Sequence, residues 1–72
     1  MSKKRCVERQ DKNGKMIFEG NILLTDEAGW RAKVVFDHGV FILINKGFSL
    51  EPNWGFCEVI GTIEDNPELL DS

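Results

Sequence analysis

Hydrophobic and polar residues alternate along the middle of the chain. In "WRAKVVFD", residues 30–37, every second residue from Trp30 onward is apolar, and three of the four residues between them are charged. A period of two is typical of a half-buried strand. The following "VFILIN", residues 40–45, is apolar on both faces, as expected of an interior strand. We therefore predict two neighbouring strands joined by a tight hairpin at His38–Gly39, since both residue types tolerate a positive φ.

Turn residues divide the rest of the chain into further short strands. Asn13–Gly14 is a strong turn signal, and "MIFEG" with "NILLT" follows as a first strand, broken or bulged at Gly20. Gly61 marks a bulge or a close approach of another group in the last strand. Further turns or loops are predicted at Asp26–Gly29, Lys46–Gly47 and Glu51–Gly55, and further strands at "FSL" and "FCEVIGTI".

The C-terminal segment has the start signal of a helix. Asn66 before Pro67 matches an N-cap followed by proline at the first helical position. Glu68 would lie near the positive end of the helix dipole. We predict a single helical turn that places Leu69 and Leu70 on the sheet.

Short strands at this spacing indicate a mainly β fold, either a small antiparallel barrel or a strongly curved sheet of SH3-like size, with a short C-terminal helical turn. With 72 residues the chain is long enough for one small domain. We assign residues 1–10 to a flexible basic lead or edge segment and residues 11–72 to a single β domain. No apolar run is long enough to cross a membrane, so no membrane partner is expected.

The residues that most often carry chemistry are few. Cys6 and Cys57 lie far apart in the sequence without CxxC spacing, which favours independent thiols in a reducing cytoplasm. A disulfide would require the first and last strands to meet. His38 is the only histidine, and the carboxylates show no arranged acid and base. We therefore expect no metal, no cofactor and no enzymatic activity.

The stretch "DKNGKMIFEGN", residues 11–21, combines an acid, an amide and glycines in a way that could suggest a ligand loop. Its first glycine comes two positions too early for an EF-hand calcium loop. It also lacks the GxxxxGK[ST] pattern of a phosphate-binding loop. The Asn-Gly turn chemistry makes it an architectural element that leads into a strand.

Charge is unevenly distributed along the chain. Residues 1–15 carry six basic and two acidic side chains, whereas residues 51–72 carry six acidic side chains and no Lys or Arg. These ends are either solvated termini that keep the protein soluble or, at the acidic end, a patch for a basic partner.

The aromatic residues are expected to fill or cover the core, as in other small domains. Phe36, Phe41, Phe48 and Phe56 are predicted to be core residues. Trp30 and Trp54, each near a turn, are expected to cap the core, with partner binding as the second interpretation. The sequence pI of about 5.0 and the scarcity of basic residues beside the aromatics argue against nucleic-acid binding.

Three segments resemble the YopX-like family of bacteriophage and prophage proteins. They are "DKNGKMIFEGN", "WRAKVVFDHGVFIL" and "EVIGTIEDNPELL", in the family's order and covering roughly residues 9–70. Phe18 and Asn21 stand where the family usually has Tyr and Asp. The family's common N-terminal segment is not found, so the chain resembles a short member built from the C-terminal part. The resemblance implies a β-rich fold and a phage or prophage origin, but no catalytic residues.

From this origin we expect a small non-enzymatic accessory protein that binds and blocks a host protein in the bacterial cytoplasm, most concretely an anti-defence inhibitor of the anti-CRISPR kind. Its partner-binding residues are predicted to be Trp30, Arg31, Glu51, Trp54, Glu58 and Glu64. One alternative is an oligomeric sponge for a nucleotide signal, with Arg31 or Lys33 on a phosphate. The other is a nucleic-acid-binding regulator that uses the basic residues Lys3, Lys4, Arg5 and Arg9. The sequence leaves open whether the chain forms a homo-oligomer.

Overall fold

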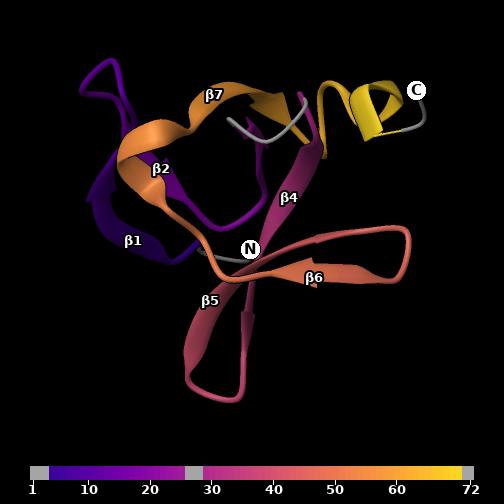
Figure 1. The fold of residues 1–72 in the computed structure, drawn as a ribbon, viewed down its shortest axis with the longest axis horizontal. Coiled ribbons are helices and arrows are strands. Elements are labelled where there is room, and N and C mark those ends of the chain that lie inside the picture. Colours follow the sequence, from indigo (N-terminus) through magenta and orange to yellow (C-terminus); the bar gives the residue numbers. More distant parts are fainter. Residues whose placement is uncertain (1–3, 26–28, 71–72) are drawn as a thin grey trace.

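The computed structural model describes residues 4–25 and 29–70, which form seven strands and two single-turn 3-10 helices (Figure 1). The strands are β1 (Cys6–Gln10), β2 (Met16–Phe18), β3 (Asn21–Leu24), β4 (Arg31–Asp37), β5 (Val40–Asn45), β6 (Phe48–Leu50) and β7 (Glu58–Thr62), and the 3-10 helices are η1 (Trp54–Phe56) and η2 (Pro67–Leu70). Parts of two predicted features, residues 1–3 of the lead segment and 26–28 of a turn, lie outside the described residues.

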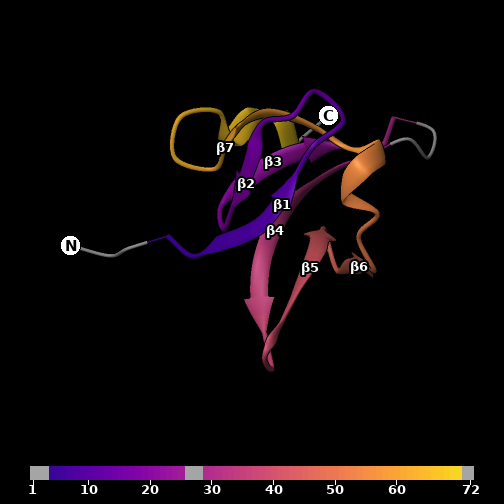
Figure 2. The same cartoon turned by 90° about the vertical axis from the view of Figure 1, so that its left-hand side faces the viewer.

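The strands form two antiparallel sheets (Figures 1 and 2). β1 pairs with β2, and a five-stranded sheet has the order β6-β5-β4-β3-β7. The prediction of a mainly β fold with a C-terminal helical turn is confirmed, the turn being η2. The barrel form is not confirmed, because within the described chain β6 and β7 are the two edges of an open sheet.

Two hairpin turns are confirmed as predicted. His38 and Gly39 have φ values of 50° and 86°, and Lys46 and Gly47 have 50° and 85°. Two consecutive left-handed residues are the signature of a type I′ turn, whose twist matches that of the flanking strands. The first turn joins β4 to β5 and the second joins β5 to β6.

The predicted break at Gly20 is confirmed, and it separates two sheets rather than bending one strand. β2 pairs with β1, whereas β3 pairs with β4 and β7. Gly20 has a φ of 90°, its N–H donates to the Val34 carbonyl at 2.9 Å, and its carbonyl accepts from Ile63 N at 2.9 Å. The turn therefore joins the first hairpin to the larger sheet on both sides.

The last strand begins later than predicted, since Phe56 lies in η1 and β7 starts at Glu58. Its register places Ile22 opposite Gly61 and Leu23 opposite Val59, so one residue of β7 is bulged out. A Cβ added at Gly61 would lie 2.6 Å from Asn66 Oδ1. Both predicted properties of Gly61, the bulge and the close approach, are thus confirmed.

Asn66 was predicted to cap the C-terminal helical turn with its side chain, but that side chain bonds to β7 instead. Its Oδ1 accepts from the N–H of Thr62 at 3.4 Å, and its backbone carbonyl accepts from Leu69 N at 3.0 Å. The close approach of Gly61 directs the amide toward β7 instead of toward the helical turn. Leu69 is half-buried, and η2 packs beside β4, as predicted.

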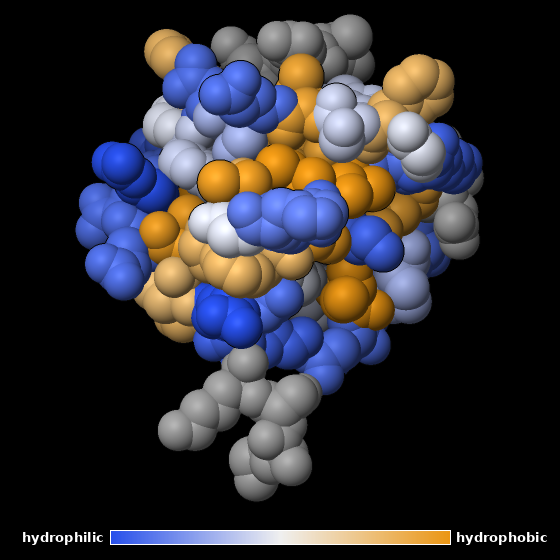
Figure 3. Space-filling view, turned by 90° about the horizontal axis from the view of Figure 1, so that it is seen from below, coloured by the Kyte–Doolittle hydropathy of each residue, from blue (hydrophilic) through white to orange (hydrophobic). Residues whose placement is uncertain are grey.

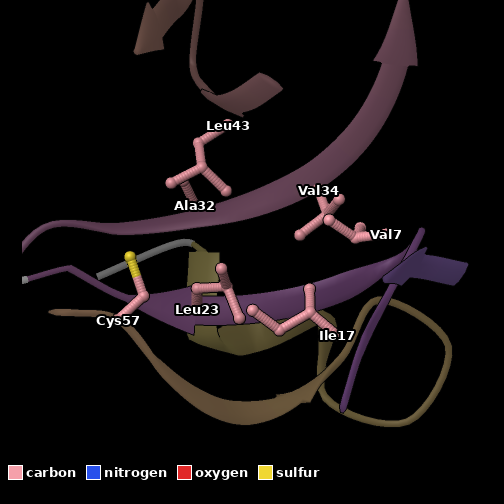
Figure 4. Close-up of a cluster of buried hydrophobic side chains, with 7 residues drawn as sticks. All are labelled: Val7, Ile17, Leu23, Ala32, Val34, Leu43 and Cys57. Carbon is pink, nitrogen blue, oxygen red and sulfur yellow. The ribbon is translucent and has the colours of Figure 1, made fainter. Parts of the chain in front are cut away.

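The core is aliphatic rather than aromatic (Figure 4). The cluster of buried side chains consists of Val7, Ile17, Leu23, Ala32, Val34, Leu43 and Cys57. The prediction that Phe48 and Phe56 are core residues is wrong, since their side chains are 71% and 59% exposed. Phe48 lies on an edge strand with a neighbour on one side only, and Phe56 lies in η1, outside both sheets.

Four of the remaining aromatic residues are half-buried, whereas Phe18 is 40% exposed. Phe36 and Phe41 are half-buried and meet edge to face, with ring centroids 5.0 Å apart. Trp30 and Trp54 are half-buried and pack against the buried cluster, which agrees with the predicted capping. No disulfide joins Cys6 and Cys57, so the disulfide alternative is not realised.

Candidate partner-binding surface

The turn at Asp11 is hydrogen-bonded to a distant strand through the Asp11 side chain. Asp11 is 5% exposed, and its Oδ1 accepts hydrogen bonds from the N–H groups of Asn13 (2.9 Å) and Lys15 (2.8 Å). Its Oδ2 accepts from Val59 N at 3.0 Å, 48 positions further along the chain. One carboxylate therefore holds its own turn and connects that turn to β7.

The ionised form of Asp11 is the one that these contacts stabilise. Burial raises the pKa of this carboxyl, but the three backbone N–H donors and the nearby Lys15 charge outweigh burial and leave the pKa below its ordinary value of 3.8. The interpretation of "DKNG" as architecture agrees with this geometry. Within the turn only Gly14 has a positive φ, so Asn13 is not left-handed.

The first hollow on the surface lies beside the outer half of β5. It has a volume of about 520 Å³, and we call it the outer hollow. The residues that line it are Val40, Phe41, Ile42, Ser49, Leu50, Glu51, Pro52 and Trp54. It forms because β6 pairs only with the second half of β5, and the chain then leaves the sheet at Glu51.

A second hollow adjoins the first and reaches the core. This inner hollow has a volume of about 290 Å³ and is lined by Thr25, Leu43, Leu50, Glu51, Asn53, Phe56 and Cys57. Leu50 and Glu51 line both hollows, so they form the ridge between them. Glu51 is the charged residue in both linings, which include no Lys or Arg among the described residues.

Large apolar side chains are exposed in the linings of these hollows and on the neighbouring strand β6. Val40, Phe48 and Phe56 are 56%, 71% and 59% exposed, respectively. Figure 3 looks onto the end of the molecule that carries the β4–β5 hairpin, and it shows hydrophobic residues in a band broken by a projecting hydrophilic group. Exposed apolar patches bordered by polar residues are typical of interaction surfaces. Sequence reasoning named Glu51 and Trp54 for this surface but missed its phenylalanines, because it assigned Phe48 and Phe56 to the core.

Of the six predicted partner-binding residues, the structure brings Glu51 and Trp54 together in the lining of the outer hollow. Glu58 and Glu64 are instead engaged within the chain. Lys12 Nζ lies 3.9 Å from Glu58 Oε1, and Lys4 forms an ion pair with Glu64. These pairs connect the basic N-terminal part to the acidic C-terminal part and partly neutralise both.

Trp30 and Arg31, the other two predicted residues, lie at the start of β4 and line neither hollow. The Trp30 carbonyl accepts from both the N–H and the Oγ1 hydroxyl of Thr25, at 2.8 and 2.9 Å. The Arg31 guanidinium donates to the Leu69 carbonyl at 3.3 Å, which ties β4 to η2. Both residues thus have structural contacts.

The basic residues named for nucleic-acid binding are also partly engaged. The Arg5 guanidinium lies over the Phe36 ring, 4.3 Å from its centroid, and Lys4 pairs with Glu64. Lys3 lies outside the described residues. A cation over an aromatic face keeps its charge but holds the side chain against the protein.

The described residues show no arrangement typical of a metal centre or a membrane span. No three His, Cys, Asp or Glu side chains in residues 4–25 and 29–70 gather in a way that could hold a metal ion. His38 Nδ1 lies 2.9 Å from Asp37 Oδ1 in an exposed hairpin. None of the helical segments in the described chain is long and apolar enough to cross a membrane.

The fold and the surface define a small, mainly β protein with an exposed apolar face beside an open sheet edge. The family model described as YopX protein matches residues 9–71, which is most of the chain. The protein therefore belongs to the YopX family and is a phage- or prophage-type protein. No curated protein matches the sequence.

Proposed function

We propose that this protein is a non-enzymatic binding protein that covers a basic surface of a host protein in the bacterial cytoplasm and thereby blocks it, most concretely as an inhibitor of antiviral defence. The observation that supports this most is the pair of hollows that meet at Leu50 and Glu51 and have exposed apolar side chains in their linings. Two adjoining hollows share Leu50 and Glu51, and Trp54 contributes a large ring to one of them. Tryptophan side chains that fill pockets are typical anchors of binding hot spots.

The proposed contact is narrower than the whole acidic C-terminal region. Glu58 and Glu64 already have Lys12 and Lys4 as partners, whereas no cation lies within ion-pair distance of Glu51 among the described residues. A Lys or Arg of the partner would thus form its most favourable ion pair with Glu51, which has no competing cation among the described residues. Trp54 would supply apolar contact area beside it, and the bulk of the domain would occlude the partner's own site.

The test is a quantitative pull-down from bacterial host lysate with tagged wild type, Glu51→Lys, Trp54→Ala and the control Glu68→Lys. Glu68 is exposed on η2 and lines neither hollow. Glu68→Lys changes the net charge by the same amount as Glu51→Lys but leaves the proposed surface intact. We expect one host protein near equal stoichiometry with wild type and with the control. Loss of an anchor or of a charge pair should weaken capture at least about tenfold. Equal capture by Glu51→Lys and Trp54→Ala would refute the proposal.

The alternatives give different results in the same preparation. A nucleotide sponge would elute with a bound nucleotide and no protein, and the nucleotide would raise the melting temperature by mass action. A nucleic-acid regulator would bind with steep salt dependence and would lose binding when the first ten residues are deleted. A hollow of about 280 Å³ does contain Lys4 and Lys33, but Glu19 lies in the same lining and Lys4 already pairs with Glu64. We therefore rank both alternatives lower.

A further inference from the structure

The outer half of β5 has a strand on one side only. β4 pairs with β5 from Val40 to Ile44, whereas β6 pairs with Leu43 to Asn45. Residues 40–42 thus lack a second neighbouring strand within the described part of the chain. Figure 1 shows the same arrangement, with the β4–β5 hairpin extending alone while β6 runs in another direction.

The register fixes which backbone groups face this gap. In a two-residue type I′ hairpin the flanking pair is hydrogen-bonded, and hydrogen-bonded and non-hydrogen-bonded pairs then alternate. Asp37–Val40 flanks the turn, so Phe36–Phe41 is a non-hydrogen-bonded pair. The N–H and C=O of Phe41 therefore point away from β4, toward the outer hollow that Phe41 lines.

The chain itself cannot fill this place. Leu43 lies opposite Leu50, so a continued β6 would bring Pro52 opposite Phe41. Proline has no N–H to donate to a ladder. The segment instead turns away into η1, and the hollow is left between Phe41 and Trp54.

The opposite edge of the sheet is closed, in contrast. On β7, Val59 N donates to Asp11 Oδ2 at 3.0 Å, and Thr62 N donates to Asn66 Oδ1 at 3.4 Å. Side chains thus occupy the N–H groups that a further strand would need. Proteins commonly cover sheet edges in this way to prevent unwanted pairing.

We propose that the outer hollow binds an extended segment of the partner, which pairs with Phe41 of β5 as an added strand in line with β6. This rests on the proposed function and specifies how the partner is recognised. The segment would carry a Lys or Arg for Glu51 and an alternating apolar residue against Trp54. Strand addition derives affinity from main-chain hydrogen bonds and specificity from pockets for alternate side chains.

The test uses synthetic peptides of alternating Lys and Val, with alternating Glu and Val as the charge control. Amide hydrogen exchange by NMR is followed at Phe41 and at Ile42, whose N–H faces β4. In the free protein Phe41 should exchange much faster than Ile42. The Lys-Val peptide should slow Phe41 exchange at least about tenfold, which corresponds to one or two backbone hydrogen bonds. The Glu-Val peptide should not.

Two matched controls separate strand pairing from simple attraction. Two Lys-Val peptides are N-methylated, one at the odd and one at the even residues, so each keeps its charge but loses every second N–H donor. One of the two should no longer slow the exchange of the Phe41 amide. Glu51→Lys should lose it as well, and Glu68→Lys should keep it. Failure of the Lys-Val peptide to bind, or an unchanged Phe41 amide at saturation, would overturn the inference.

Self-association gives a different outcome. If Phe41 becomes protected with rising protein concentration and no peptide, a second copy occupies the hollow, and the assignment to a basic partner is wrong. If a host protein binds through Glu51 and Trp54 while Phe41 stays unprotected in the complex, strand addition fails and the proposed function stands.

Discussion

At the scale of single residues, Asp11 shows how one side chain can connect distant parts of a small sheet. Its position before Asn13–Gly14 is a sequence signal for a turn, because Asp side chains bond the backbone two residues later. Its bond to Val59 has no such signal, since that contact exists only after β7 folds back on the first turn. The turn was thus predictable from the sequence, whereas the hydrogen bond between Asp11 and Val59 was not.

The first prediction concerns the free energy of unfolding. Asp11→Ala would leave three backbone N–H donors, those of Asn13, Lys15 and Val59, without their acceptor. We expect a loss of about 2–4 kcal/mol, because three part-buried hydrogen bonds to a charged acceptor are lost at once. Asp11→Asn, which keeps one acceptor oxygen, should lose less. Urea denaturation followed by tryptophan fluorescence measures both, and equal stability of Asp11→Ala and wild type would show that the carboxylate is dispensable.

The second prediction is the pH dependence of this contribution. The folded state depresses the pKa of Asp11 below 3.8, so the stabilisation is complete above 3.8 and is lost as the pH falls from there through the lower folded-state value. The stability difference between wild type and Asp11→Asn should therefore be constant near neutral pH and should shrink below 3.8. Denaturation series over this range measure it, and a difference that grows on acidification would contradict the assignment.

At the scale of elements, β2 to β7 and the tight turns were predictable because they depend on local chemistry. β1 falls within residues 1–10, which the sequence analysis assigned to a flexible lead or edge segment. Alternation identified β4, and the residue pairs at His38–Gly39 and Lys46–Gly47 identified the turns with positive φ. The assignment of β2 and β3 to different sheets depends on what each strand meets elsewhere. Periodicity carries no information on that choice.

The third prediction tests the close approach at Gly61. A Cβ there would lie 2.6 Å from Asn66 Oδ1 and 3.0 Å from Asn66 Cβ. Gly61→Ala must therefore displace Asn66, with an expected cost of about 1–3 kcal/mol. In an Asn66→Gly background, which lacks both the amide and the Cβ, the same substitution should cost clearly less. A double-mutant cycle by chemical denaturation isolates this coupling, and additive effects would mean that the two residues do not interfere.

At the scale of the whole molecule, a small domain has too little interior for its large side chains. The aliphatic core takes the positions enclosed between the two sheets, and the aromatics are left to cover it or to face solvent. Which phenylalanines are excluded depends on the sheet order, since Phe48 lies on the edge strand β6. Sequence reasoning predicted Glu51 and Trp54 for one partner surface, and the structure brings them together in the lining of the outer hollow. It could not find the hollow between them, which arises from where β6 stops.

The fourth prediction separates this exposed surface from the core. Phe48 is 71% exposed, so Phe48→Ser should change the free energy of unfolding by less than about 0.5 kcal/mol. Leu43 is fully buried in the cluster. Leu43→Ala should lower the free energy of unfolding by about 2–5 kcal/mol, because it leaves a cavity. Phe48→Ser should nevertheless weaken capture of the host protein, since Phe48 lies in the strand that borders both hollows. Paired denaturation and pull-down measurements decide this. If Phe48→Ser unfolds the protein as readily as Leu43→Ala, Phe48 is part of the core after all. If it leaves both stability and capture unchanged, the binding surface does not extend past Leu50 along β6.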